Sequence, residues 1–575
     1  MKKTLGYITL AATLFACNGQ QQTKQEPVAQ KHLSRVDSMS NMPQPFEIID
    51  WKMMAQKFDN TVFDFTATGE HWPLVWWDST RHNYNQNVVG VFTAIGDDRQ
   101  GTHNKGMFHE ALANMGAVLG ATLTGVNKSN QNGLNYVGML KNYFNRETGW
   151  NIMMNNTCPE VALLGGGYGR DWWYDVYPNM FFYAIYSKYP DQKDFDSIAH
   201  SIAEKFCGAD SILNGNYDYS FFDYGKMKPM KNNICTQQDA AAGHAFVLYA
   251  AYKKFGDDRY LKAAKSALSA LEKQPQNTYY EIFMPFGAYM AAKLNAEQGT
   301  KYDVQKFLEW TFDGTPKCRE GWGTLVGNWN GIDISGIVGS TTDRGGYGFL
   351  MNTFDQAWPL VPLVRYDPSY ANVIGKWMLN AANAAKLFYP QYMPKDHQTI
   401  PQKADVTKGV IAYEGIIHSP SYPQYKNLKA PVAQGDGPLW APKNPDVSQF
   451  SVYGSGHVGI FGSIIATTDV PGILQLDLLA TDFFHDKAYP SYLSYNPYAE
   501  AKKVTIAAGN EEVDVYDVIS RSFVAKKVKG SCEVNIPAQS SAILVMIPAG
   551  AHIEHKDGKM FANNVVVDYG AGQTP

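Results

Sequence analysis

A repeated pair of helices joined by a tight turn constrains the fold of this chain more than any other feature of its sequence. Residues 248–273 read LYAAYKKFGDDRYLKAAKSALSALEK, in which an apolar helix runs into the turn FGDD and a second helix follows. The second helix is apolar on one face, because its hydrophobic residues recur at spacings of three and four. Residues 181–206 and 358–388 repeat this order, with turns at YPD and YDP. Three copies at unequal intervals predict a helix-pair repeat interrupted by long insertions.

Further segments have the periodicity of helices and bring the expected number close to a dozen. They are residues 47–58, 105–124, 134–144, 281–294 and 457–466. A dozen helices arranged in pairs can close into a ring, and an open superhelical array of helix pairs is the alternative. From Lys503 the sequence changes to short β-branched runs in which polar and apolar residues alternate, a pattern typical of a small β-domain.

Loops rich in glycine and aromatic residues separate the helices, and residues 165–178, GGGYGRDWWYDVYP, are the densest example. These loops, the helix pairs and the aromatic-Gly/Pro-Asp turns resemble the six-hairpin, (α/α)6-barrel superfamily of glycoside hydrolases and polysaccharide lyases. The resemblance spans residues 37–498 and rests on the repeat pattern. It implies a mainly α fold, an (α/α)6 toroid over residues 46–498, followed by a small antiparallel β-sandwich domain over residues 499–575.

The first residues predict export. MKKTLGYITLAATLFAC has two lysines, an apolar run and a small residue before Cys17, which resembles the lipobox of bacterial lipoproteins. We expect residues 1–16 to be a signal peptide, Cys17 to carry lipid, and residues 17–45 to form a flexible tether. The protein is then a lipoprotein of the outer membrane, on the cell surface or the periplasmic face. An ordinary secretory signal, with Cys17 incidental, is the alternative.

Charge and cysteine content suggest few other partners. The net charge of −4 comes from 50 basic and 54 acidic residues without a basic stripe, so nucleic acid is not an expected partner. The five cysteines after Cys17 are scattered and include no C-x-x-C pair. They indicate neither a zinc site nor a disulfide framework, although one bridge can form. No metal and no cofactor is expected.

Helix length places several acids at one end of the repeat. Asp175 and Asp239 stand fourteen and sixteen residues before the turns of their helix pairs. At about 1.5 Å per residue they lie some 20 Å from those turns, at the opposite rim. Asp343 precedes the next turn by a loop and a helix, so Arg344 and Tyr347 are expected on the same rim. A rim of glycine-rich and aromatic loops that carry acids is a candidate substrate cleft.

The residue types of 165–178 suit a sugar. Tyr168, Trp172 and Trp173 offer flat faces for the C–H surfaces of a pyranose, and Arg170 and Asp171 can bond its hydroxyls. Adjacent residues of a helix point in different directions, so one of the two tryptophans belongs to the core.

Hydrolysis of a glycosidic bond needs an acid for the leaving oxygen and a second carboxylate. The candidate carboxyl groups are Asp171, Asp175, Asp239, Asp343, Asp355 and Glu160. We predict Asp171 as the general acid, because burial beside aromatic rings raises a carboxyl pKa, and Asp343 as the base. Each has a structural alternative: Asp175 and Asp239 can be helix N-caps, and Asp171 and Asp343 can pair with the arginine beside them.

A second cluster, between residues 413 and 463, can close over the barrel. Its candidate ligands are Glu414, His418, Asp436, Trp440 and His457. A loop that only packs is the alternative for this Pro- and Gly-rich segment. His244, inside an apolar helix, is expected to be a core residue, and His109-Glu110 lacks the second histidine of a zinc protease motif.

The leading function is a glycoside hydrolase that acts on an oligosaccharide or polysaccharide. A polysaccharide lyase is the first alternative; Tyr168, Arg170, His418 and His457 could then remove a proton from a uronic acid and neutralise its carboxylate. A noncatalytic glycan-binding lipoprotein is the second alternative.

Overall fold

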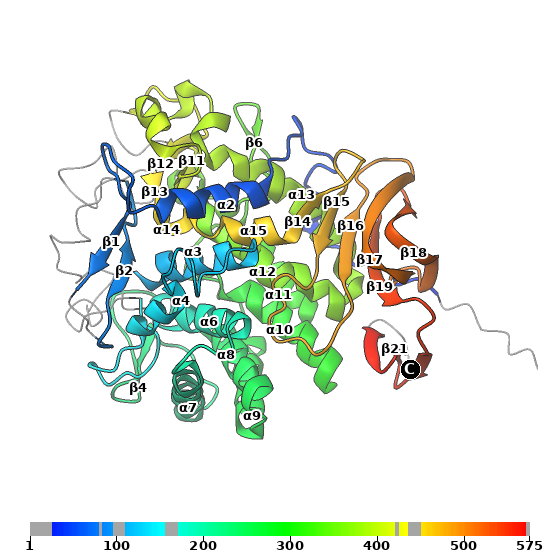
Figure 1. The fold of residues 1–575 in the computed structure, drawn as a ribbon, viewed down its shortest axis with the longest axis horizontal. Coiled ribbons are helices and arrows are strands. Elements are labelled where there is room, and N and C mark those ends of the chain that lie inside the picture. The colour runs from blue at the N-terminus through cyan, green and yellow to red at the C-terminus, as the bar shows by residue number, and fades with distance from the viewer. Residues whose placement is uncertain are drawn as a thin grey trace, which may run out of the picture.

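The computed structural model describes residues 26–79, 83–95, 110–155, 171–419, 425–434 and 450–570. Helices fill the centre of the molecule, and β-strands lie at both ends of it (Figure 1). The helices surround a common axis, and the carboxyl-terminal strands, orange to red in Figure 1, pack against one end of that axis.

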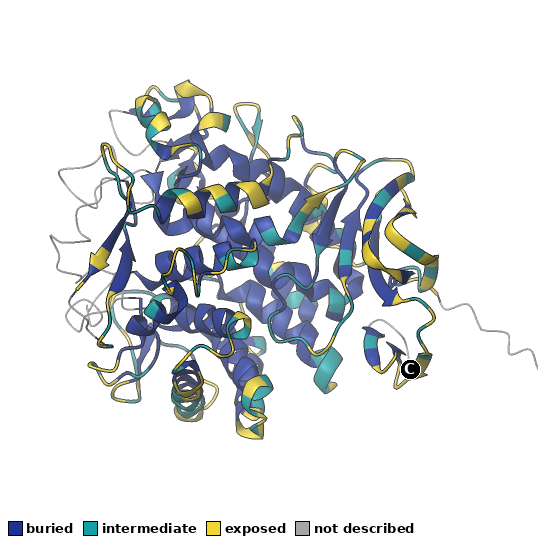
Figure 2. Ribbon diagram, viewed as in Figure 1, coloured by how far each residue is buried: buried dark blue, intermediate teal, exposed yellow. Residues whose placement is uncertain are grey.

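Six helices of the described chain form a closed inner ring, in which each contacts the next and the last contacts the first. They are α3 (Ala111–Leu123), α6 (Trp172–Lys188), α8 (Ala240–Phe255), α10 (Phe283–Gln298), α12 (Leu350–Tyr366) and α15 (Val458–Ile464). Nearly every residue of these helices is buried (Figure 2), because each has neighbours on all sides. Their sequences are accordingly apolar around the whole circumference.

An outer layer covers the ring. It consists of α2 (Trp51–Val62), the short α4 (Tyr136–Met139) with the 3-10 helix η2 (Leu140–Tyr143), α7 (Phe195–Leu213), α9 (Asp258–Glu272), α11 (Val304–Phe312) and α13 (Ala371–Ala384). Most of these helices bury one stripe and expose the rest, which is why their apolar residues recur at three and four. Inner and outer helices alternate along the chain, and α2 packs on α15 to close the circle. The predicted (α/α)6 toroid is confirmed.

Glycine permits the closest contact in the ring. Gly120 of α3 and Gly459 of α15 face each other, and a Cβ at either position would overlap the backbone of the other helix. The last inner helix can therefore seal the ring against the first.

Short strands lie at the end of the ring where the inner helices begin. They are β1 (Val75–Asp78), β2 (Val88–Val91), β3 (Phe221–Asp223), β4 (Lys228–Met230), β5 (Trp322–Thr324), β6 (Asn328–Trp329), β7 (Ile332–Asp333), β8 (Val338–Ser340), β9 (Tyr347–Phe349), β10 (Ala412–Tyr413), β11 (Gly415–Ile417), β12 (Val432–Gln434) and β13 (Phe450–Ser451). Five of them form one antiparallel sheet in the order β12-β11-β9-β8-β5. This sheet joins the insertions around residues 320–350 and 413–434, which lie far apart in the sequence.

The β-domain begins earlier than residue 499. Its six-stranded antiparallel sheet has the order β14-β15-β16-β19-β17-β18. The strands are β14 (Ile465–Thr467), β15 (Leu474–Asp477), β16 (Ser491–Tyr495), β17 (Lys502–Asp517), β18 (Ser522–Ile536) and β19 (Ser541–Pro548). A smaller sheet contains β20 (Ile553–Lys556), β21 (Lys559–Ala562) and β22 (Val565–Asp568). The sheet starts directly after α15, and a second small core forms where Val504 and Ile506 pack near Leu544 and Met546.

Buried charges fix the β-domain to the ring. Asp482, between β15 and β16, lies 2.8 Å from Lys293 of α10 and also pairs with Arg365 of α12. Although Asp482 is fully buried, these two cations hold the pKa of its carboxyl well below the ordinary value. The loop between β15 and β16 therefore fastens the β-domain to α10 and α12.

Residues 26–45 differ from the expected flexible tether. Leu33, Val36 and Met39 are buried in the main core, around the short helix α1 (Ser34–Asp37). The backbone N–H of Val28 donates to the carbonyl of Ile519 at 2.8 Å. The three buried apolar side chains anchor the segment to the barrel, and the Val28 hydrogen bond joins it to the β-domain. No helix within the described ranges is both long enough and apolar enough to cross a membrane.

Candidate active site

Acidic side chains gather where the inner helices begin. The carboxylate ring, as we call it, consists of Glu110, Asp171, Asp239, Glu281 and Glu414. The first three are the N-cap residues of α3, α6 and α8, and Glu281 directly precedes the N-cap of α10. The backbone carbonyl of Glu414 accepts a hydrogen bond from the first residue of α12 at 3.0 Å. Because all inner helices start at the same end, the sequence positions of these acids converge on one mouth.

Asp171 is almost completely buried at the start of α6. Burial raises the pKa of its carboxyl to about 7, and the negative charge of Glu281 acts in the same direction. The backbone N–H of Tyr174 donates to Oδ1 at 3.4 Å and opposes this shift only weakly. Asp171 is therefore both a helix cap and a carboxyl group that holds its proton near neutral pH. The direction of the shift and its main cause are those expected from the sequence.

Asp239 is fully buried at the start of α8, and burial raises its pKa to about 8. The side chain does not cap its own helix. Instead Oδ2 accepts a hydrogen bond from the backbone N–H of Tyr280 at 3.0 Å, which links the starts of α8 and α10. Among the described residues, Oδ1 has no hydrogen-bond partner. The negative charges of Glu281 and Asp171 raise the pKa of Asp239 further.

Glu281 has a cationic partner. Arg319, in the loop before β5, forms an ion pair with its carboxylate, and Asn352 Nδ2 donates to Oε2 at 3.1 Å. The indole N–H of Trp322 donates to the backbone carbonyl of Glu281 at 3.1 Å. An opposite charge and a hydrogen bond both favour the ionised form of a carboxyl group. The site thus combines two carboxyl groups whose pKa is raised by burial with a third that is paired with a cation.

Two tyrosines lie between the acids. The pKa values of Tyr174 and Tyr453 are raised well above the ordinary value by burial first, and then by nearby charges that include Glu110 and Glu281. Both hydroxyls therefore remain protonated and can donate hydrogen bonds. Trp173 lies beside Tyr453 and stacks on Tyr177, with ring centroids 4.9 Å apart. Aromatic faces and hydroxyl donors next to carboxyl groups are the features that a sugar-binding site requires.

The two tryptophans of the glycine-rich stretch are both buried and contact different neighbours. Trp172 is fully buried and packs edge-on against His244, with ring centroids 5.2 Å apart, so it belongs to the core. Trp173 is also buried, and its ring packs near Phe283, with ring centroids 6.3 Å apart. Asp175, one turn after Asp171, is also buried, and its charge acts on Tyr224, which contacts His244. Asp175 and Trp172 therefore share the face of α6 that turns away from the carboxylate ring.

Asp343 lies on the 3-10 helix η3 (Asp343–Gly345), between β8 and β9. Its side chain is 50% exposed, and Arg344 Nε lies 3.9 Å from its Oδ1. The neighbouring Tyr347 is buried with Arg344 over its ring, 5.8 Å from the centroid. His418 joins this group through β11, because its backbone N–H donates to the carbonyl of Gly346 at 2.8 Å.

The structure thus brings together three residues that the sequence assigned to the rim, Asp343, Arg344 and Tyr347, and His418 of the second cluster. Trp322 connects them to the carboxylate ring: its ring centroid is 6.5 Å from that of Tyr347, and its indole N–H bonds the Glu281 backbone. Asp171, in contrast, has Glu281 as the acid that acts on it most strongly. These contacts favour Glu281 over Asp343 as its partner.

His457 and Asp355 lie inside the ring rather than at its mouth. Both are fully buried, and His457 Nδ1 is 2.7 Å from Asp355 Oδ1. The expected substrate contact of His457 is absent, because its ring nitrogens are directed at Asp355 and at the carbonyl of Leu112. His244 is a satisfied core residue, as predicted, with Tyr217 and Tyr224 hydroxyls on its two nitrogens. Burial lowers the pKa of His244 to about 3, so its ring is neutral.

Several predicted residues lie outside the described part of the chain. They are Cys17, Glu160, Tyr168, Arg170, Asp436 and Trp440. Within the described ranges, no group of three or more His, Cys, Asp or Glu side chains is arranged to hold a metal ion.

Sequence reasoning missed Glu110, Glu281, Arg319, Tyr174 and Tyr453 as site residues. One signal for Glu281 was present: it stands at the start of the predicted helix 281–294, in the position that Asp239 occupies in its own helix. Applying the same rim argument to that helix would have selected it. Arg319 had no such signal, because it lies in a loop whose path depends on tertiary contacts.

A groove of about 630 Å³ opens elsewhere on the surface, between Tyr84, Arg146 and the start of α7. Asp194 is the acidic residue in its lining, and its carboxylate is 2.7 Å from Lys141. A single carboxylate paired with lysine offers no acid and base, so this groove is not the catalytic candidate.

Comparison with known proteins gives structural similarities. No protein-family profile and no curated protein matches the sequence. Among solved structures, a GH127 β-L-arabinofuranosidase from Geobacillus stearothermophilus T6 is 11% identical, with a TM-score of 0.28 over 80% of this chain and 75% of that chain. A second GH127 β-arabinofuranosidase is 9% identical, with a TM-score of 0.36 over 90% and 78%. An unsaturated glucuronyl hydrolase from Streptococcus agalactiae is 10% identical, with a TM-score of 0.28 over 61% and 89%. Matches at this level say nothing about the reaction, so function has to be inferred from this chain's own residues.

Proposed function

We propose that the protein is a glycoside hydrolase that cleaves an oligosaccharide or polysaccharide at the mouth of the helical ring. The observation that carries this proposal is the contrast between two neighbouring carboxyl groups. Burial raises the pKa of Asp171 to about 7, whereas Glu281 is ion-paired with Arg319, and an opposite charge favours the ionised form of a carboxyl group. Environments that push two carboxyl groups toward opposite protonation states supply the acid and the base that glycoside hydrolysis requires.

In this proposal Asp171 protonates the leaving glycosidic oxygen, and Glu281 activates water or attacks the anomeric carbon. Asp239, which also retains its proton near neutral pH, donates a hydrogen bond to a sugar hydroxyl. Trp173 provides an apolar face, and the hydroxyls of the mouth tyrosines bond the sugar. Asp343, the base expected from the sequence, is placed in the outer part of the cleft, where with Arg344 and His418 it contacts sugar units beyond the cleaved bond.

A polysaccharide lyase is less well supported by the site. A lyase needs a tyrosine or histidine that gives up its proton readily, and a cation for the uronic acid carboxylate. The pKa values of Tyr174 and Tyr453 are raised, His457 is buried, and Arg319 is already paired with Glu281.

One screen tests the proposed function against both alternatives. The purified protein is incubated with plant and host glycans, and the release of reducing ends is measured together with ultraviolet absorbance. We expect new reducing ends without absorbance. Reducing ends accompanied by absorbance of an unsaturated uronide would identify a lyase, and binding to a glycan without either signal would identify a noncatalytic binding protein.

We also propose that the enzyme is exported and anchored to the outer membrane through lipid on Cys17. The disulfide between Cys235 and Cys318 supports an oxidising compartment, since such bonds are rare in reducing cytosol. Cys17→Ser should give a soluble or unprocessed protein in cell fractionation. A variant of mature mass that still partitions into detergent would contradict the lipid anchor.

A further inference from the structure

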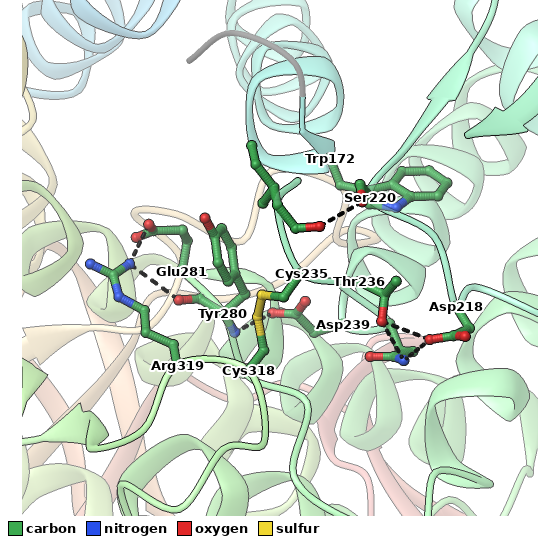
Figure 3. The surroundings of a disulfide bond; sticks show 12 residues. Trp172, Asp218, Ser220, Cys235, Thr236, Asp239, Tyr280, Glu281, Cys318 and Arg319 are labelled. Atoms are coloured by element: carbon green, nitrogen blue, oxygen red, sulfur yellow. Dashed lines mark hydrogen bonds and ion pairs between the residues drawn. A yellow bond between two sulfur atoms is a disulfide. The ribbon is translucent and has the colours of Figure 1, made fainter. Parts of the chain in front are cut away.

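One disulfide joins two loops at the mouth of the ring. Cys235 lies between β4 and α8, and Cys318 lies between α11 and β5, 83 residues later. Their Cα atoms are 6.0 Å apart, and the bond stands beside the acids of the site (Figure 3). The sequence allowed a single bridge without predicting which cysteines form it. The bond fixes the spacing of loops that belong to different helix pairs.

On the Cys318 side, the next residue is Arg319. Its guanidinium pairs with Glu281, donates through one terminal nitrogen to the backbone carbonyl of Tyr280 at 3.3 Å, and lies 3.5 Å from the ring centre of Trp322. These three contacts cover most of the arginine side chain, which is 24% exposed. Arg319 therefore has one well-defined position as long as its loop stays in place.

On the Cys235 side, the loop before α8 is fixed by a small network (Figure 3). Thr236 Oγ1 and Gln238 Nε2 each donate to Asp218 Oδ1 at 2.6 Å. Asp239 follows directly, and its Oδ2 accepts from the backbone N–H of Tyr280 at 3.0 Å. The loop thus positions a carboxyl group that reaches across to the start of α10.

The two sides meet at Tyr280 and Glu281. The N–H of Tyr280 is held by Asp239, and its carbonyl and the Glu281 carboxylate are held by Arg319. We propose that the Cys235–Cys318 disulfide and Arg319 form a clamp that fixes Glu281 relative to Asp239, with Arg319 as the positioning residue. This inference rests on the proposed function, in which Glu281 is the reacting carboxylate.

The clamp has a consequence that a purely structural bond would lack. The charged and titratable groups around Glu281 are Arg319, Asp171, Asp239, Tyr174, Tyr279, Tyr280 and Tyr453. All but Arg319 are acids or phenols, so they either oppose the negative charge of Glu281 or leave it unchanged. Removing the arginine should therefore raise the pH at which Glu281 becomes ionised, because an opposite charge typically lowers a carboxyl pKa by about one to three units.

The first test replaces the arginine. Arg319→Met should move the acidic limb of the pH profile of kcat/KM upward by about one unit or more and lower kcat/KM on the order of 10²-fold. Arg319→Lys should move the limb back toward wild type, because it restores the charge. Lys317→Met, on the same loop with an exposed side chain, is the matched control and should change neither quantity.

The second test removes the disulfide. The double variant Cys235→Ser/Cys318→Ser should lower kcat and shift the acidic limb in the same direction, at a temperature where circular dichroism shows native helix content. Cys207→Ser, which removes a free cysteine of α7, is the matched control. If the double variant does not fold, reduction of the folded wild-type protein with dithiothreitol replaces it, and the same shift is expected.

Failure of the clamp and failure of the proposed function give different results. If Glu281→Gln is inactive while the arginine and cysteine variants keep the wild-type kcat and acidic limb, the clamp is wrong and the function stands. If Glu281→Gln is fully active, or no glycan is cleaved, the function is wrong. The clamp is then decided by a crystal structure of the cysteine double variant: displacement of Arg319 from Glu281 supports it, and an unchanged ion pair overturns it.

Discussion

His457 Nδ1 lies 2.7 Å from Asp355 Oδ1 inside the ring, where neither side chain reaches solvent. The other ring nitrogen, Nε2, is 3.1 Å from the backbone carbonyl of Leu112, to which it donates because a carbonyl can only accept. One imidazole therefore connects α15, α12 and α3, including the two helices that close the ring. The histidine that the sequence assigned to the substrate is instead part of the barrel's interior.

We expect His457→Leu to destabilise the protein by about 3–5 kcal/mol, because it leaves the Asp355 carboxyl unpaired in the core. The double variant His457→Leu/Asp355→Leu should recover much of that loss. Urea unfolding measures both, and kcat per folded molecule should stay near wild type. If His457→Leu lost activity without losing stability, the result would indicate that His457 contacts the substrate.

Asp171→Asn preserves the shape of the side chain and removes the proton that the proposed acid transfers. Turnover should fall by about 10²- to 10⁴-fold, the usual contribution of a general acid, while helix content changes little. Since the pKa of Asp171 is raised to about 7, wild-type kcat/KM should decline above roughly that pH, and the residual activity of the variant should lack this limb. Strong destabilisation with normal specific activity would instead indicate a structural cap.

The identity of the second carboxylate can be tested by a matched pair of variants. Glu281→Gln should abolish most turnover, whereas Asp343→Asn should mainly raise KM for longer substrates, because Asp343 is half exposed and lies farther out in the sheet at the mouth. Steady-state kinetics on a short and a long substrate separate the two effects. If Asp343→Asn abolished turnover and Glu281→Gln mainly raised KM, Asp343 would be the base.

Asp239 should make stability depend on pH. Its carboxyl keeps a proton up to about pH 8 in the folded protein, compared with an ordinary value of 3.8, so folding favours the protonated form. This contribution is fully present below about pH 4 and is lost as the pH rises through about 8. The free energy of unfolding should fall across this range by up to about 1.4 kcal/mol per pH unit for one proton. Asp239→Asn should flatten the slope measured by urea unfolding.

Gly459→Ala tests the seal between the first and last inner helices. A methyl group at this position overlaps the backbone of Gly120, so α3 and α15 must separate. We expect a loss of at least about 1–3 kcal/mol, the usual cost of overpacking, and a lower melting temperature. Ser463→Ala, on the same helix and partly exposed, should stay within about 0.5 kcal/mol of wild type. Equal melting temperatures for the two variants would show that the helices can move apart freely.

The helix pairs were predictable because periodicity is a local property. The three hairpins found in the sequence correspond to α6–α7, α8–α9 and α12–α13, with turns at the expected residues. The long insertions were not predictable in the same way, because their strands pair with partners far away in the chain. β9, for example, pairs with β11. The β-domain starts at Ile465 rather than at residue 499, because β14 belongs to the same sheet as the later strands.

The sequence by itself determined the alternation of helices, the β-rich tail and the end of the ring at which Asp175 and Asp239 lie, since helix length and the position of the turns decide which rim an acid occupies. Only the tertiary structure decided which acids act together. The pKa values of Asp171 and Asp239 depend on burial. The charge environment of Glu281 depends on its ion pair with Arg319. Arg319 lies in a loop that the Cys235–Cys318 bond joins to the loop before α8. Burial and charge pairing depend on distances between segments remote in sequence, and those distances exist only once the ring has closed.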